Sequence, residues 1–400
     1  MVDRFAAEKI RGFGTSVFSE MSRLAVQHDA VNLGQGFPDF AGPDFVKDAA
    51  KAAIDADLNQ YAIGHGAVRL RHAIASIWAR DYGREIDPER EITVTSGATE
   101  AIFDIIQALI GPGDELITFE PFYDSYLPSA ILAGGSLRPV RLYPPDWLFD
   151  RDELAAAFTP RTKAILVNTP HNPTGKVFGR EELEFIADLC RQHDVAAITD
   201  EVYDRITYDD AVHVSLATLP EMWERTLVLN STGKTFSMTG WKLGFAVGSA
   251  ALNAAIRTVH QFVTFATATP FQDAMAKAME IAGEIGYYDR LRREYTARRD
   301  HLKGELDAAG LPALPVAGSY FLMADIAELG FDSDVAFCRF LTSNVGVAAV
   351  PPSAFYVDPS TAPLLARFCF AKREDTLTEA GRRLRGLPAQ LNQRAVAAFE

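Results

Sequence analysis

The residue whose chemistry is easiest to state is a lysine that lies between two apolar runs. Lys234 follows the strand-forming run 226–229 and precedes the apolar run 243–247, in a segment of small residues that begins at Ser231. We expect it on a loop between two buried strands, where small residues let the backbone approach a ligand. Burial lowers the pKa of a lysine and leaves a nucleophilic amine, as Schiff-base chemistry requires. Taken alone, the segment also fits a solvated loop, and Lys242 competes for the same role.

An aspartate and an asparagine follow two other expected strands. Asp200 comes after the residues 197–199, and Asn172 precedes Pro173 beyond the run 163–168. A carboxylate at the end of a strand can hold a protonated ring nitrogen through an ion pair. An aspartate in this place is more often a turn or helix-capping residue, and Asn before Pro is typical of a turn. For Asn172 the turn and a ligand-binding role are compatible.

A helix is expected to begin directly after the strand 92–95. Its first residues are Gly97, Ala98 and Thr99. Free backbone N–H groups and the positive end of the helix dipole suit a phosphate, and the Thr99 hydroxyl adds a donor. A plain helix start is the alternative. No G-x-G-x-x-G pattern follows the strand, so this is not a dinucleotide-binding fingerprint.

An arginine near the C-terminus precedes a further apolar strand. Arg367 comes just before Phe368-Cys369-Phe370. A buried planar guanidinium suits bidentate recognition of a carboxylate, whereas a surface arginine is the simpler alternative. Near the N-terminus, the segment 32–39 is rich in glycine, and the glycines that flank Gln35 allow close backbone approach. An ordinary interdomain turn explains that segment equally well.

The composition excludes several classes of partner. The net charge of −14 and the pI near 5.1 argue against nucleic acid and anionic membranes. The three cysteines, Cys190, Cys338 and Cys369, have no metal-binding spacing and fit core thiols in a reducing compartment. The N-terminus mixes acidic and basic residues and has no secretory pattern, and no apolar stretch is long enough to span a bilayer. We therefore expect a soluble cytoplasmic protein.

Alternating strand and helix patterns indicate an α/β fold. Strand-like runs lie at 92–95, 115–119, 137–142, 163–168, 196–199, 226–229 and 244–247. Helix-like periodicity lies at 45–55, 70–82, 99–110, 180–193 and 252–262. This alternation favours a largely parallel sheet covered by helices on both faces, and ligands of such sheets bind beyond the carboxyl ends of the strands.

Three regions are expected along the chain. Residues 1–43 form an N-terminal arm and part of a small domain, and residues 44–286 form a large ligand-binding domain. Residues 287–400 begin with a long polar helix, 287–309, and continue into a small C-terminal α+β domain. Its strands are expected at 320–325, 347–350 and 367–370, with a helix at 333–343.

Taken together and in this order, the motifs identify the chain as similar to fold-type I aminotransferases that depend on pyridoxal 5′-phosphate (PLP). Within that class it most resembles the kynurenine aminotransferase and glutamine transaminase K group and its bacterial relatives. The resemblance runs from about Val17 to the final helix. It implies a large domain with a mostly parallel seven-stranded sheet, a smaller α+β domain, PLP as cofactor and a homodimer with shared active sites.

The resemblance also assigns roles to individual residues. Lys234 is the Schiff-base lysine and general base, Asp200 pairs with the pyridine nitrogen, and Tyr203 and Asn172 bond the phenolic oxygen. The residues implied to hold the cofactor are Gly97, Ala98, Thr99, Tyr123, Asn172, Asp200, Tyr203, Ser231, Lys234, Lys242 and, from the partner subunit, Tyr61. The residues implied to bind substrate are Gly36, Asn172, Arg367, Phe18 and Phe265, the last from the neighbouring subunit.

The substrate is expected to be a large neutral or aromatic L-amino acid, with a 2-oxo acid as acceptor. Phe18 stands where the mammalian kynurenine enzymes have tryptophan, and Ala266 replaces the histidine that follows the aromatic at Phe265. The pocket thus keeps apolar walls and loses a polar side chain, which favours kynurenine, methionine, phenylalanine or glutamine over dicarboxylates. Bacterial relatives that use N-succinyl-diaminopimelate share the motifs around Asn172 and Tyr123, so that substrate stays open.

Three other functions remain as alternatives. A cysteine-conjugate β-lyase would use the same site with a leaving group on Cβ. An aminotransferase-like regulator would need a DNA-binding module before residue 15 or after residue 390, and we see no room for one. A dinucleotide-dependent oxidoreductase would need the glycine fingerprint that is missing.

Overall fold

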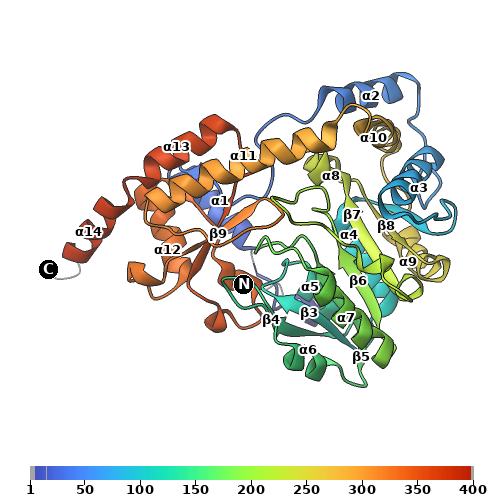
Figure 1. Ribbon diagram of the computed structural model, residues 1–400, viewed down its shortest axis with the longest axis horizontal. Helices are drawn as coiled ribbons and strands as arrows, with labels where there is room; N and C mark the ends of the chain where they lie inside the picture. The colour runs from blue at the N-terminus through green and yellow to red at the C-terminus, as the bar shows by residue number, and fades with distance from the viewer. Residues whose placement is uncertain (1–4, 15, 398–400) are drawn as a thin grey trace.

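A seven-stranded sheet forms the centre of the larger part of the molecule (Figure 1). The computed structural model describes residues 5–14 and 16–397. The strands of the sheet are β2 (Ile92–Thr95), β3 (Glu115–Glu120), β4 (Ser136–Arg141), β5 (Thr162–Asn168), β6 (Ala196–Asp200), β7 (Thr226–Ser231) and β8 (Gly244–Gly248). They follow the order β2-β8-β7-β6-β5-β3-β4. Strand β8 runs antiparallel to β2 and β7 and the other pairs are parallel, which confirms the expected mostly parallel sheet.

Successive residues of the inner strands face two separate apolar cores. In β5, Ala164 and Leu166 pack into one core, and Ile165 and Val167 pack into the other. Alternate side chains of a strand point to opposite faces, so a strand covered on both faces is apolar throughout. The first face is covered by helices that include α4 (Gly97–Leu109) and α9 (Ala250–Val263), and the second by α6 (Arg151–Ala157) and α7 (Arg180–His193).

The smaller part of the molecule combines a segment from the N-terminal region with the C-terminal region of the chain. Strand β1 (Val31–Asn32) pairs with β10 (Val347–Ala348), and β9 (Phe321–Asp325) pairs with β11 (Leu365–Cys369). The long helix α11 (Tyr287–Ala308) spans from the region of the large sheet to this part (Figure 1). The other helices are α1 (Val17–Gln27), α2 (Asp44–Asp55), α3 (Val68–Tyr82), α5 (Tyr126–Leu132), α8 (Thr232–Thr235), α10 (Thr269–Ala282), α12 (Asp334–Phe340), α13 (Glu374–Leu384) and α14 (Leu387–Ala397). The N–H of Cys369 in β11 donates to the carbonyl of Leu33 at 2.7 Å, so the segment after β1 lies beside β11.

One local expectation is wrong. Lys234 lies in the four-residue helix α8 and not on a loop, because the Ser231 hydroxyl caps that helix by accepting the N–H of Gly233. The helix expected over 333–343 is present, as α12 to Phe340 and then as a π-helical turn, Leu341–Val345. Helix ends of this kind depend on side-chain hydrogen bonds and packing more than on periodicity.

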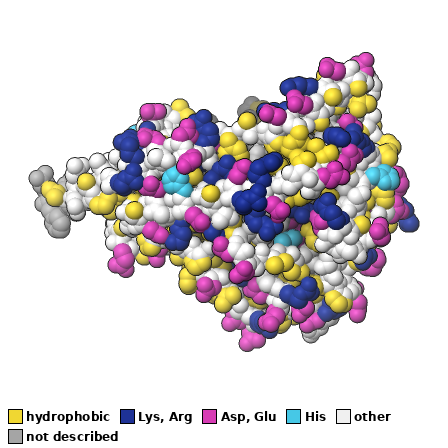
Figure 2. Space-filling model, turned by 45° about the horizontal axis from the view of Figure 1, so that its top comes forward, with side chains coloured by type: hydrophobic (Ala, Val, Ile, Leu, Met, Phe, Trp, Pro, Cys, Tyr) yellow, Lys and Arg dark blue, Asp and Glu magenta, His cyan; other side chains and the backbone are white. Residues whose placement is uncertain are grey.

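The three cysteines are all buried and free, as expected of core thiols. Acidic and basic side chains are intermingled over the face drawn in Figure 2. Among the described residues, no helix combines the length and the apolar character that crossing a membrane would require.

Candidate active site

A cavity of about 290 Å³ lies where the parallel strands end. Asp200 closes β6 and Ser231 closes β7, so the two side chains meet at the same edge of the sheet. Strand β11 and the segment after β1 contribute the opposite wall. Of the site residues expected from the sequence, the cavity wall contains Phe18, Gly36, Gly97, Ala98, Thr99, Tyr123, Asn172, Asp200, Tyr203, Ser231, Lys234, Lys242 and Arg367.

Lys234 reaches the cavity from helix α8. Its Nζ donates a hydrogen bond of 3.0 Å to the hydroxyl of Tyr320 and lies 5.6 Å from the centre of the Tyr203 ring. Burial lowers the pKa of Lys234 to about 8, and the positive charge of Lys242 acts in the same direction. The amine is therefore far more nucleophilic near neutral pH than an ordinary lysine.

The lowered pKa of Lys234 predicts an early step in its chemical labelling. Only the neutral amine attacks an electrophile, so the labelling rate of Lys234 by trinitrobenzenesulfonate should rise through about pH 8 and then level off. A lysine in a short unstructured reference peptide, labelled in the same mixture, should reach the same point only near pH 10, the ordinary range for lysine. Peptide mapping by mass spectrometry, with ligand-free protein labelled at a series of pH values, measures the two labelling rates. Coincident midpoints for the two lysines would contradict the burial argument.

Asp200 presents a buried carboxylate to the same cavity. Its Oδ2 accepts a hydrogen bond of 2.7 Å from the Tyr126 hydroxyl, and its Oδ1 accepts the N–H of Val202 at 3.4 Å. Burial raises the pKa of Asp200 to about 6, against the effect of the Tyr126 hydrogen bond. A carboxylate held in this way is ready to pair with a cationic ring nitrogen, because such a partner would offset its desolvation.

Two tyrosines of the wall remain phenols near neutral pH. Burial raises the pKa of both Tyr203 and Tyr123. The Tyr203 ring meets the Tyr320 ring edge-on at 5.0 Å, and the Tyr123 ring meets the Tyr126 ring edge-on at 5.8 Å. These contacts fix the orientation of both rings. The Tyr203 hydroxyl can then act as a hydrogen-bond donor, and the face of the Tyr123 ring can act as a stacking surface.

The start of α4 forms a cradle that suits a phosphate. Ser96 makes no side-chain capping bond, so the first amide groups of the helix have no side-chain cap. Gly97 has a φ of +78°, and a Cβ there would lie 3.1 Å from the side chain of Lys242. Lys242 Nζ in turn donates to Thr99 Oγ1 at 3.3 Å. Amide groups, a hydroxyl and an ammonium group thus converge, and a side chain in place of Gly97 would obstruct them.

Arg367 lies on the opposite wall, inside an aromatic cage. Its Nη1 donates to Asn172 Oδ1 at 3.0 Å, and its Nη2 donates to the carbonyl of Gly34 at 3.0 Å. The rings of Phe18, Phe321 and Phe355 lie 5.1, 4.1 and 5.0 Å from the guanidinium carbon. Burial lowers its pKa to about 10, so the group stays charged near neutral pH. A buried cation whose Nε has no hydrogen-bond partner among the described residues is a strong candidate for binding a carboxylate.

Two expected site residues do not line this cavity. Tyr61 and Phe265 contact one another edge-on at 5.2 Å on the surface, where they are 83% and 52% exposed. Other apolar side chains exposed on the neighbouring segments are Ile63, Val68, Phe262 and Val263. Both residues were expected to act in a neighbouring subunit, and this role stays a prediction.

Comparison with known proteins decides the family. The sequence pattern of aminotransferase class I and II matches residues 28–384. This chain belongs to the class I and II aminotransferases. A probable N-succinyldiaminopimelate aminotransferase of Mycobacterium tuberculosis is 44% identical over 94% of this chain and 97% of its own. Human kynurenine–oxoglutarate transaminase 1 is 41% identical over 98% of this chain and 100% of its own.

Solved structures agree with this assignment. A crystal structure from Escherichia coli, whose reactivity identifies a methionine aminotransferase function, superposes with a TM-score of 0.92. It is 41% identical and covers 96% of this chain and 100% of that one. The expected fold-type I architecture is therefore confirmed, and with it the expectation that the protein is an aminotransferase rather than a regulator or an oxidoreductase.

The sequence reading of this aminotransferase missed three residues that support the site. The Tyr320 hydroxyl accepts from Lys234 Nζ and donates to the Gly36 carbonyl at 2.6 Å. The Tyr126 hydroxyl bonds Asp200. Lys372 Nζ donates to the carbonyls of Gln35 and Phe37 at 3.2 and 2.8 Å. Tyr320 and Lys372 thus both hold the glycine-rich segment 32–39 in place. No local sequence pattern marks a buried tyrosine or lysine as a residue that supports a site in this way.

Proposed function

We propose that this aminotransferase uses PLP in the cavity and moves the α-amino group of a large neutral L-amino acid to a 2-oxo acid. The observation that carries the proposal is that a lysine of lowered pKa, a buried aspartate and a caged arginine face one cavity. A nucleophilic amine, an acid for a ring nitrogen and a binder for a carboxylate are the groups that amino-group transfer needs.

The residues of the cavity fit PLP. Gly97, Ala98, Thr99, Ser231 and Lys242 would hold its phosphate at the start of α4, where a Cβ on Gly97 would crowd the Lys242 side chain. Asp200 would pair with its ring nitrogen, and Tyr203 and Asn172 would donate to its phenolic oxygen. The Tyr123 ring would offer the pyridine a stacking surface. When bound, PLP supplies an aldehyde for amine exchange and a ring that takes up electrons from the substrate Cα.

Lys234 and Arg367 act on the substrate. The Lys234 amine would hold the aldehyde group of the cofactor, and as a free amine it would take the proton from the substrate Cα. Tyr320 orients that amine by accepting its hydrogen bond and by donating to Gly36. Arg367 binds the α-carboxylate through its planar fork, together with Asn172. The absence of a side chain at Gly36 keeps this part of the cavity open. A Cβ there would lie 2.9 Å from the Phe321 ring, which packs against the Arg367 guanidinium.

The wall of the substrate side favours a large apolar side chain. Phe18, Phe37, Ile102 and Phe321 line the cavity, and its cations, Lys234, Lys242 and Arg367, all have assigned roles. Kynurenine, methionine, phenylalanine and glutamine fit this wall. N-succinyl-diaminopimelate is the second candidate, since a relative named for it is 44% identical. That substrate adds carboxylates for which the described wall offers no further cation.

Substrate preference tests this reading. With a common 2-oxo acid acceptor, kcat/KM for L-methionine, L-phenylalanine or L-kynurenine should exceed that for N-succinyl-diaminopimelate by about 100-fold or more, because burying an unpaired carboxylate costs several kcal/mol. Coupled assays of 2-oxo acid formation measure all four. A preference for N-succinyl-diaminopimelate would instead favour the second candidate. Pyruvate release from a cysteine conjugate would reveal β-lyase activity at the same site.

A homodimer completes the proposed site. Tyr61, Phe262 and Phe265 are exposed apolar groups on one region, and soluble monomers seldom expose several such groups together. A second copy of this chain would cover them and would bring Tyr61 toward the partner's phosphate and Phe265 toward the partner's substrate. Symmetric dimers bury the same surface of both subunits, so each site would gain the same two rings.

A further inference from the structure

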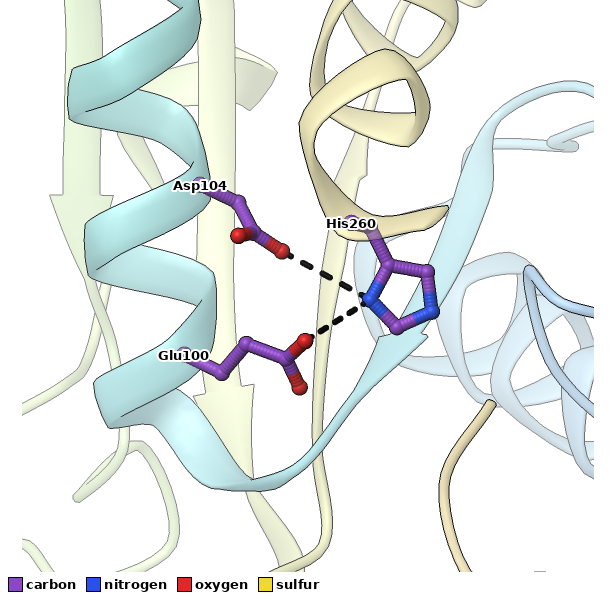
Figure 3. Close-up of side chains that lie close together, drawn as sticks. All are labelled: Glu100, Asp104 and His260. Carbon is purple, nitrogen blue, oxygen red and sulfur yellow. Dashed lines mark hydrogen bonds and ion pairs between the residues drawn. The ribbon is translucent and has the colours of Figure 1, made fainter. Parts of the chain in front are cut away.

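Three buried ionisable side chains form a cluster beside the cofactor cradle (Figure 3). Glu100 and Asp104 lie one turn apart on α4, so both face His260 of α9. Nδ1 of His260 is 2.9 Å from Glu100 Oε1 and 3.6 Å from Asp104 Oδ2. The three residues are only 8%, 1% and 1% exposed in the order Glu100, Asp104, His260. None of them lines the active-site cavity.

The surroundings of His260 favour a proton on each ring nitrogen. Nε2 lies 2.8 Å from the carbonyl oxygen of Gly64, which can only accept. Nδ1 faces two carboxylates, which also accept when ionised. Although burial disfavours the charged ring, the carboxylates of Asp104 and Glu100 raise the pKa of His260 to about 10. The ring is an imidazolium that donates in two directions.

One direction leads to the phosphate cradle. Glu100 accepts a hydrogen bond from His260 Nδ1 on one oxygen and a hydrogen bond from the backbone N–H of Ser96 on the other. Ser96 is the residue before Gly97, where α4 begins. The position of the cradle relative to α9 is therefore fixed through the Glu100 carboxylate, and Asp104 takes no part in this hydrogen-bonded path.

The other direction leads to the exposed aromatic pair. Gly64 belongs to the segment that carries Tyr61, and the carbonyl of His260 itself accepts the N–H of Phe265 at 3.1 Å. A Cβ on Gly64 would meet the carbonyl oxygen of Phe265 at 3.0 Å, so the two segments lie in close contact. His260 thus holds together the segments from which Tyr61 and Phe265 project.

We infer that His260 is a positioning residue whose two ring N–H groups fix the phosphate cradle and the Tyr61–Phe265 surface relative to one another. The inference rests on the proposed function, because it takes the cradle to hold the phosphate of PLP and the surface to meet a second copy of this chain. The His260 ring then positions both the phosphate cradle of its own subunit and the Tyr61–Phe265 surface that contacts the partner subunit.

Glu100→Gln separates this role from general packing. An amide has one accepting and one donating end, so glutamine cannot accept from both Ser96 and His260. The dissociation constant of the enzyme for PLP should rise about tenfold, as expected for the loss of a hydrogen bond to a charged group. The constant for pyridoxal, which lacks the phosphate, should change by less than about twofold. Asp104→Asn, of the same shape and outside the path, should leave both constants within about twofold.

His260→Ala tests the second direction. It should weaken PLP binding like Glu100→Gln, and it should also raise the dimer dissociation constant about tenfold in sedimentation, whereas Glu100→Gln should leave the dimer unchanged. If His260→Ala does not fold, the Glu100 and Asp104 variants still decide the question for the cradle.

Several outcomes would overturn the inference. The first is a dissociation constant for PLP that Glu100→Gln leaves unchanged, and the second is an equal loss of PLP and pyridoxal binding in that variant. The third is a divalent metal ion bound stoichiometrically in the purified enzyme, because it would replace the proton on Nδ1 of His260. A wild-type protein that binds no PLP would instead reject the proposed function itself.

Discussion

Replacement of Lys234 by alanine should lower kcat for transamination by at least about 10⁴-fold. The amine is the only group in the proposed mechanism that moves the Cα proton, and loss of a positioned general base alone costs about 10²–10⁴-fold. Loss of the nucleophile that holds the cofactor adds to this. Steady-state assays of 2-oxo acid formation from the best amino donor measure the change.

Two arginine variants separate chemistry from charge. Lys234→Arg keeps a cation but cannot supply a neutral amine, since an arginine stays protonated, so it should be as inactive as the alanine variant. Lys242→Arg keeps the charge that faces Thr99 and should retain activity within about tenfold. Equal losses in Lys242→Arg and Lys234→Arg, or substantial activity in Lys234→Ala, would contradict the role of Lys234.

Replacement of Arg367 by leucine should strongly weaken the use of amino acids and spare cofactor binding. The leucine leaves the α-carboxylate without a partner in an aromatic cage, which should cost about 4 kcal/mol, or about 10³-fold in kcat/KM. The dissociation constant for PLP should stay within a few-fold, because the cradle lies on the other wall. Substrate titration and PLP titration of the same preparation measure both quantities.

Arg367→Lys supplies the graded control. A lysine keeps the charge but not the planar fork, so its kcat/KM should fall between those of the wild type and the leucine variant. Loss of cofactor from the leucine variant would mean that Arg367 supports the fold of the site and not the substrate carboxylate.

The residues that the sequence identified are those whose roles follow from local position. Asp200 and Ser231 end strands of one parallel sheet, so their meeting at one edge follows from strand order. Arg367 faces the same cavity through the pairing of β11 with β9, and its role came from the family motif.

The supporting residues depend on contacts between distant segments. Tyr320 lies 86 positions from Lys234 and 284 from Gly36, and its two hydrogen bonds exist only in the folded chain. Lys372 reaches the carbonyl of Gln35 across 337 positions. His260 joins Glu100 across 160 positions. Periodicity and short motifs describe neighbours along the chain, so they carry no signal for such pairs.

The roles proposed for Tyr61 and Phe265 require a second chain. Their exposure on this chain agrees with a subunit interface but could not be derived from the alternation of strands and helices. Helix α8 was missed for another reason. Four residues are too few for a periodic pattern, and the capping hydroxyl of Ser231 decides their conformation.

The most direct test of the central claim is a single turnover with no acceptor present. Purified enzyme with PLP is mixed with L-methionine, L-phenylalanine or L-kynurenine, and the visible spectrum and the 2-oxo acid released are followed together. The account predicts one equivalent of 2-oxo acid per subunit, recovery of the cofactor as pyridoxamine phosphate, and neither change in Lys234→Ala. A cofactor spectrum that no amino acid alters, or 2-oxo acid formed equally by Lys234→Ala, would contradict it.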